Sequence, residues 1–92
     1  MLFTIYCIDK DNAAELRAAN LKAHGEYLAS KPIDIVLCGP LRTHDGVTTI
    51  GSLFVVEADS VERVEAFSRN DPLYKAGVWG RREVHAFVKR DV

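Results

Sequence analysis

The sequence lacks the short motifs that identify most cofactor-dependent enzymes. It contains no GxGxxG, no GxxxxGK[ST], no CxxC and no HExxH, so neither a nucleotide-binding loop nor a structural zinc site is indicated. Its three histidines, His24, His44 and His85, do not show the close spacing of metal ligands. We therefore expect neither a metal nor an organic cofactor.

Excess charge and long apolar runs are also missing. Twelve basic and 13 acidic residues give a formal net charge of -1, which offers no electrostatic attraction to nucleic acid or to an anionic membrane. No apolar run approaches the roughly 20 residues of a membrane-spanning helix, and the N-terminal segment lacks the basic region of a signal peptide. We therefore expect no nucleic-acid partner and no membrane partner.

Cysteine is scarce, with only Cys7 and Cys38 in 92 residues. Two cysteines are too few for the disulfide framework of a small secreted domain, so both thiols are expected to be reduced in a cytoplasmic protein. Both occur in apolar segments, where a free cysteine acts as a small buried hydrophobe. The length and the 48% hydrophobic content indicate one globular domain over residues 1–92.

Six segments have the periodicity of secondary structure. Strands are predicted at residues 2–8, 33–38, 48–58 and 82–89, and helices at residues 13–30 and 60–70. Gly39-Pro40 is expected to break or bend the second strand, and residues 75–81 are expected to form a loop. Gly51 is expected to mark a bulge or a close backbone approach.

The caps of the two predicted helices are less well defined by the sequence. Asp11 or Asn12 is expected to cap the first helix, and Asp59 or Ser60 the second. The second helix is expected to end at Asp71-Pro72.

The order of these elements is β-α-β-β-α-β. It predicts a ferredoxin-like α+β fold, with a four-stranded antiparallel sheet and both helices on one face. The strands are nearly continuous apolar runs, a composition that favours burial of both faces. One helix layer cannot cover both faces, so a homodimer that packs sheet against sheet is expected.

His24 lies on the same face of the first predicted helix as Arg17, Leu21 and Leu28. A partly buried structural histidine is one interpretation, and a general acid or base is the other. Arg17 lies about 10.5 Å from His24 along the helix axis. It can either clamp a substrate carboxylate or extend into solvent.

Other candidate residues are each open to a structural interpretation. Asp71 before proline is ordinary turn chemistry unless the fold brings it to His24. Tyr74 and Trp79 can form pocket walls or pack in the core. His85 faces opposite to its apolar neighbours and can line the sheet interface or the pocket, and His44 is expected to be exposed in a turn.

Several dispersed residues together resemble a known family. Nearly the whole chain is similar to the YCII-related proteins in the order and spacing of His24, Gly39-Pro40, Gly51-Ser52, Asp71-Pro72, Tyr74, Lys75-Ala76-Gly77-Val78 and Trp79. The resemblance implies a dimeric α+β barrel with an active site built on a His-Asp pair, here His24 and Asp71. Leu73, between Pro72 and Tyr74, departs from the family pattern. The candidate substrate-binding residues are Arg17, Ser52, Tyr74 and Trp79.

Three functions remain open from the sequence. The first is a cofactor-independent lyase, isomerase or dehalogenase that moves a proton beside the carbonyl of a lactone or small carbonyl compound; the resemblance extends to chloromuconolactone dehalogenases. The second is a small-molecule-binding or accessory protein without turnover, and the third is a purely structural dimer. An enzyme requires His24 and Asp71 within hydrogen-bond reach at a concave pocket.

Overall fold

Four strands form one antiparallel sheet in the computed structural model, which describes residues 1–92. The strands are β1 (Leu2–Asp9), β2 (Asp34–Arg42), β3 (Thr49–Glu57) and β4 (Trp79–Phe87). They lie in the order β2-β3-β1-β4, and every neighbouring pair is antiparallel. The ferredoxin-like α+β architecture predicted from the sequence is thereby confirmed.

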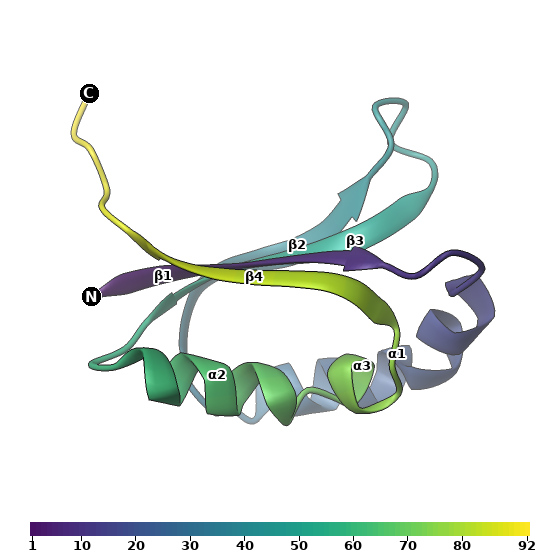
Figure 1. Cartoon of the computed structure of the whole chain (residues 1–92), viewed down its shortest axis with the longest axis horizontal. Helices are drawn as coiled ribbons and strands as arrows, with labels where there is room; N and C mark the ends of the chain where they lie inside the picture. Colours follow the sequence, from purple (N-terminus) through teal and green to yellow (C-terminus); the bar gives the residue numbers. More distant parts are fainter.

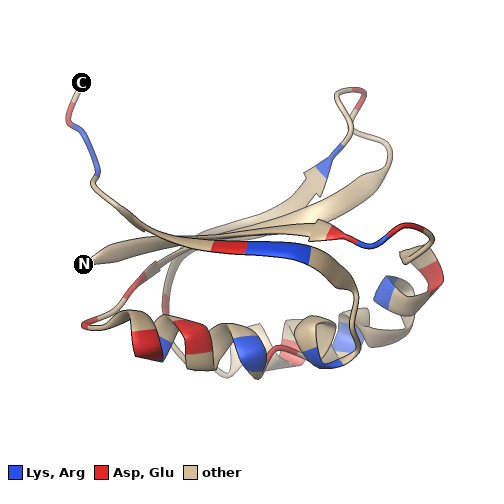
Figure 2. Ribbon diagram, in the orientation of Figure 1, with Lys and Arg blue, Asp and Glu red and all other residues tan.

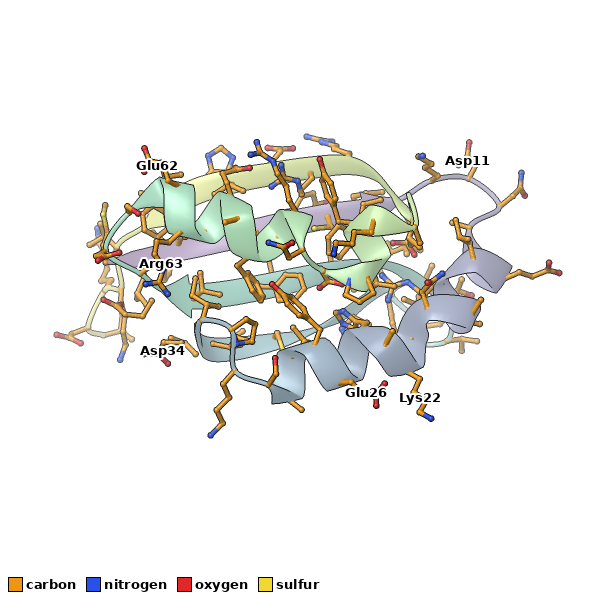
Figure 3. The ribbon with its side chains drawn as sticks, turned by 90° about the horizontal axis from the view of Figure 1, so that it is seen from below. Asp11, Lys22, Glu26, Asp34, Glu62 and Arg63 are labelled. Carbon is orange, nitrogen blue, oxygen red and sulfur yellow. The ribbon has the colours of Figure 1, made fainter.

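The helices cover one face of this sheet (Figure 1). They are α1 (Ala14–Ala29), α2 (Val61–Arg69) and a single turn, α3 (Pro72–Lys75). Viewed from the helix side, α1 and α2 lie next to each other across the sheet, and Lys22 and Glu26 lie at the outer edge of α1 (Figure 3). The core between these layers consists mainly of Phe3, Ile5, Cys7, Phe54, Val56, Val64, Phe67 and Leu73.

The opposite face of the sheet has no covering layer (Figure 1). Along β1 the residues alternate between buried and half-buried, so Thr4 and Tyr6 point away from the helices. Strand pairing places His85 beside Thr4 and Leu53 beside Tyr6 on this uncovered face. Charged residues are scarce in β1 and β3 and are concentrated in the helices, the loops and one stretch of β4 (Figure 2).

Two strands differ from the prediction in where they begin or end. β2 continues through Gly39 and Pro40, and Pro40 pairs with Ser52 of β3. Proline is tolerated there because β2 is an edge strand, where no further ladder bond is required of its nitrogen. β4 begins at Trp79, which pairs with Asp9, so the predicted loop over residues 75–81 is shorter. β4 also ends at Phe87, which leaves Val88 outside the sheet.

Gly51 marks a close backbone approach, as predicted. A Cβ atom at this position would overlap the carbonyl oxygen of Cys7 on the neighbouring strand. The absence of a side chain therefore permits β1 and β3 to pair directly before Ser52.

The helix starts agree only partly with the sequence prediction. Ser60 caps α2 by accepting a hydrogen bond from the Arg63 N–H at 3.3 Å. Neither Asp11 nor Asn12 caps α1, whose N-cap is Ala13. Asn12 instead adopts a left-handed conformation with φ of 61°, which asparagine tolerates better than most residues. No helix in the structure is long and apolar enough to cross a membrane.

Candidate functional site

A cavity of about 260 Å³ lies between α1 and the β2–β3 edge of the sheet. An engineered cavity of about 150 Å³ holds benzene, so this volume suits one substituted six-membered ring. Its lining comprises Arg17, Leu21, His24 and Leu28 of α1, Cys38, Gly39 and Pro40 of β2, and Ser52 and Phe54 of β3. The predicted shared face of α1 therefore forms one wall, although Leu21 is half-exposed.

The structure brings His24 into contact with Asp71, which lies 47 residues further along the chain. The Nδ1 atom of His24 is 2.9 Å from each carboxylate oxygen of Asp71, and Asp71 is completely buried. A carboxylate acceptor places the ring hydrogen on Nδ1. The opposite ring nitrogen, Nε2, has no partner in the protein and is not buried, so it is available to a ligand in the cavity.

The local sequence explains the position of Asp71. Asp71 is the N-cap of α3, and its Oδ1 atom accepts a hydrogen bond from the Leu73 N–H at 2.8 Å. Pro72 follows at the first helical position, where its fixed φ angle suits a helix start. The Asp-Pro pair therefore begins a new turn instead of merely ending α2, and this turn carries the carboxylate to α1.

Arg17 is held in a second, largely buried ion pair that was not predicted from the sequence. Its Nε atom donates to Asp9 Oδ2 at 2.7 Å and its Nη2 atom to Asp9 Oδ1 at 3.0 Å. Nη2 also donates to Ser52 Oγ at 2.8 Å. The available signal was the alternation of β1, because residues 3, 5, 7 and 9 share the face that α1 covers.

Tyr74 and Trp79 do not belong to the lining of this cavity. Tyr74 is partly exposed, and the guanidinium of Arg82 lies 5.3 Å from its ring centroid. Trp79 is buried and contacts Phe54 edge-to-face, with 6.1 Å between the ring centroids. The indole Nε1 of Trp79 is the one buried side-chain polar atom without a hydrogen-bond partner. Trp79 therefore lies behind a wall of the cavity.

The two cysteines differ in their surroundings, and both thiols are free. Cys7 is buried, and desolvation raises its pKa to about 12. Cys38 is exposed at the cavity, which corrects the expectation that it is buried. Partial desolvation, followed by the negative charge of Asp71, raises the pKa of Cys38. No cluster of three or more His, Cys, Asp or Glu side chains is placed to hold a metal ion.

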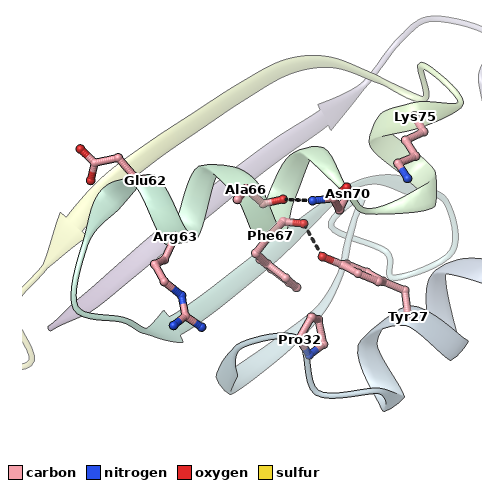
Figure 4. Close-up of a pocket in the computed structure, with 8 residues that line it drawn as sticks. All are labelled: Tyr27, Pro32, Glu62, Arg63, Ala66, Phe67, Asn70 and Lys75. Carbon is pink, nitrogen blue, oxygen red and sulfur yellow. Dashed lines mark hydrogen bonds between the residues drawn. The ribbon is translucent and has the colours of Figure 1, made fainter.

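A larger hollow of about 660 Å³ lies between the end of α1 and α2 (Figure 4). Two of its polar side chains are engaged locally, because the Tyr27 hydroxyl donates to the Phe67 carbonyl and Asn70 donates to the Ala66 carbonyl, both at 2.8 Å. It contains no histidine. The smaller cavity, with His24 and Arg17 in its wall, is the better candidate for chemistry.

Comparisons with known proteins agree with this architecture. The family model of the YCII-related domain matches residues 1–88. The structure is similar to 5-chloro-2-hydroxyhydroquinone dehydrochlorinase (TftG) from Burkholderia phenoliruptrix AC1100, in complex with 2,5-dihydroxybenzoquinone, with a TM-score of 0.87 and 33% identity over 96% of this chain and 94% of that one.

Two further solved structures share the fold at low sequence identity. At3g17210 from Arabidopsis thaliana has a TM-score of 0.54 and 13% identity over 99% of this chain and 96% of its own. Atu4242 from Agrobacterium tumefaciens has a TM-score of 0.50 and 14% identity over 92% of this chain and 89% of its own. No curated protein matches the sequence significantly.

Proposed function

The chain belongs to the YCII-related domain family, and on this basis we propose that it is a cofactor-independent enzyme that transfers a proton on a small ring compound bearing carbonyl or hydroxyl oxygens. The observation that carries this proposal is the His24–Asp71 pair, whose imidazole opens onto a cavity of ring size. A positioned histidine near neutral pH is a common general base.

In the proposed dehalogenation, His24 Nε2 carries a proton from a ring hydroxyl to the chlorine-bearing carbon, so that the ring becomes a keto tautomer. Chloride then leaves with the electrons of the C–Cl bond while a second ring hydroxyl gives its proton to His24, which yields a hydroxyquinone. Asp71 is a positioning residue that holds the imidazole of His24 and stabilises the imidazolium. The proton then passes from His24 to solvent; returning it to another carbon of the ligand would give an isomerisation.

The similarity to a dehydrochlorinase favours the dehalogenase-type reaction among these alternatives. TftG is 33% identical over nearly the full length of both chains and is seen in complex with 2,5-dihydroxybenzoquinone. A ring of this size matches the cavity of about 260 Å³ beside His24. We therefore place chlorinated hydroxyhydroquinones first among the candidate substrates.

Chloride release from 5-chloro-2-hydroxyhydroquinone, the substrate in the name of TftG, tests this proposal. We expect turnover that falls about 10²–10⁴-fold in His24→Gln, because the general base is lost. His44→Gln is the matched control, since His44 is exposed in the β2–β3 turn. Deuterium uptake at a ligand carbon, followed by NMR, extends the assay to isomerisation. Binding without either reaction would identify a ligand-binding protein and refute the enzymatic proposal.

The uncovered sheet face supports a homodimer as the functional assembly. Tyr6 and Leu53 lie next to each other on this face without a covering layer, and a second copy can cover the same residues symmetrically. Light scattering at micromolar concentration is expected to show a dimer, and Leu53→Glu is expected to weaken it. A natively folded monomer of the unaltered protein would contradict the proposal.

A further inference from the structure

The guanidinium of Arg17 has few hydrogen-bond donors left for a ligand. An arginine has five N–H groups. The Nε hydrogen and one Nη2 hydrogen point to the two oxygens of Asp9, and Nη2 also donates to Ser52. Nη1 alone makes no hydrogen bond within the protein, and it is not among the buried polar atoms that lack a partner. Nη1 is therefore the one guanidinium nitrogen of Arg17 that is free to bind a ligand in the cavity.

This arrangement disfavours a ligand carboxylate at Arg17. A carboxylate binds arginine best through two parallel N–H···O bonds along one edge of the guanidinium. Asp9 occupies the Nε–Nη2 edge, and Ser52 takes the Nη2 hydrogen that would complete the Nη1–Nη2 edge. A ligand carboxylate that displaced Asp9, whose side chain is 10% exposed, would leave the largely buried charge of Asp9 without a partner.

Ser52 supplies a second donor at the same end of the cavity. Its Oγ atom accepts from Arg17 Nη2 at 2.8 Å, and its own hydroxyl hydrogen has no acceptor in the protein. Because Ser52 and Arg17 both line the cavity, a single ligand oxygen can accept from the hydroxyl and from Nη1. A carbonyl, enolate or phenolate oxygen meets this requirement, and both donors would stabilise negative charge that develops on it.

We infer that the cavity selects ring compounds that present one carbonyl or hydroxyl-derived oxygen to Arg17 and Ser52, and that it discriminates against ring carboxylates. Asp9 is then a specificity-determining positioning residue that acts through Arg17. The inference deepens the proposed function, since it rests on this cavity being the ligand site. It also argues against the carboxylate clamp, which was one of the two interpretations of Arg17 left open by the sequence.

A matched pair of ligands tests the inference by binding alone. Hydroxyhydroquinone and gentisate are both hydroquinones with one added group, a hydroxyl in the first and a carboxylate in the second. Calorimetry without oxygen is expected to show that hydroxyhydroquinone binds about tenfold more tightly or better. Ser52→Ala frees the Nη2 hydrogen without changing charge, so the ratio of the two dissociation constants is expected to shift about tenfold toward gentisate.

Asp9→Asn is expected to shift the ratio in the same direction, because it loosens the other edge of Arg17. Asp11→Asn is the matched control that removes the same charge from an exposed loop position, and it is expected to leave the ratio unchanged. If Asp9→Asn fails to fold, Ser52→Ala decides the test. A merely structural role for these residues would lower stability without moving the ratio.

Three outcomes would overturn the inference: equal or tighter binding of gentisate by the unaltered protein, an unchanged ratio in Ser52→Ala, or no binding of either ligand. None of these measurements requires turnover. Chloride release that depends on His24 would then still support the proposed function, and its absence would refute that function without affecting the binding ratio.

Discussion

Two carboxylates, one buried and one largely buried, lie behind the same cavity, and they differ in the cation that each one holds. Asp9 binds Arg17 through both oxygens, and a guanidinium has only donors to offer. Asp71 binds His24, and an imidazole has a second ring nitrogen that can accept a proton. The comparison teaches that, in the proposed function, the partner decides the role of each carboxylate: one pair fixes a hydrogen-bond donor and the other prepares a proton acceptor.

The largest effect is expected from Asp71→Asn, which tests whether this carboxylate serves proton transfer. Asparagine keeps an oxygen for the Leu73 N–H but no longer fixes the tautomer of His24. We expect turnover to fall by up to about 10⁴-fold, no further than in His24→Gln, with little loss of folded protein, as measured by chloride release and circular dichroism. Asp11→Asn is the control. Equal turnover in Asp71→Asn and Asp11→Asn would show that the Asp71–His24 pair has no more part in turnover than an exposed carboxylate.

The next effect concerns stability and tests whether Asp9 and Arg17 act as a fixed unit. Arg17→Met leaves the Asp9 carboxylate without a partner, so the free energy of unfolding is expected to fall by about 3–5 kcal/mol. Adding Asp9→Asn to Arg17→Met is expected to recover part of this loss. Urea unfolding measures both, with Arg63→Met as an exposed control. Strict additivity of the two substitutions would show that the pair is not coupled.

A smaller effect separates the two roles of Asp71. Asp71→Ala removes the N-cap of α3 as well as the partner of His24. Loss of such a cap typically costs about 1–2 kcal/mol, so the alanine variant is expected to unfold at lower urea than the asparagine variant while its turnover is equally low. Coincident unfolding curves would indicate that the cap contributes nothing to stability.

Most of the fold follows from the sequence, because alternation in β1 and the order of elements are local signals. Two features were not predicted. The helix α3 is only four residues long, too short for a periodic signal, and β2 continues through Gly39-Pro40 because an edge strand tolerates proline. At the site, residue spacing placed His24 and Arg17 on one face of α1. The approach of Asp71 depends on tertiary packing that no spacing encodes, and it was expected only from the family resemblance.

The smallest effect is a difference in reactivity between the exposed Cys38 thiol and the buried Cys7 thiol. Cys38 is expected to react with dithionitrobenzoate in the folded protein, whereas Cys7, buried and with a pKa of about 12, is expected to react only after unfolding. Because the pKa of Cys38 lies above its ordinary value of 9.0, its thiolate fraction at neutral pH is lower than that of a free thiol. The Cys38 rate is therefore expected to keep rising beyond about pH 9.

A bound ring compound is expected to slow the Cys38 reaction severalfold, because Cys38 lines the same cavity as His24 and Arg17. Modification of Cys7 at the rate of Cys38 in the folded protein would contradict the burial of β1. An unchanged Cys38 rate at saturating ligand would place the ligand elsewhere.

Trp79 provides the molecule with a built-in optical reporter. It is the single tryptophan of the chain, so all indole emission comes from one position. Its ring is buried and packs edge-on against Phe54, which forms part of the cavity wall. A quinone in the cavity would lie one aromatic ring away from the indole and quench it, so ligand binding can be followed in the unlabelled protein by fluorescence.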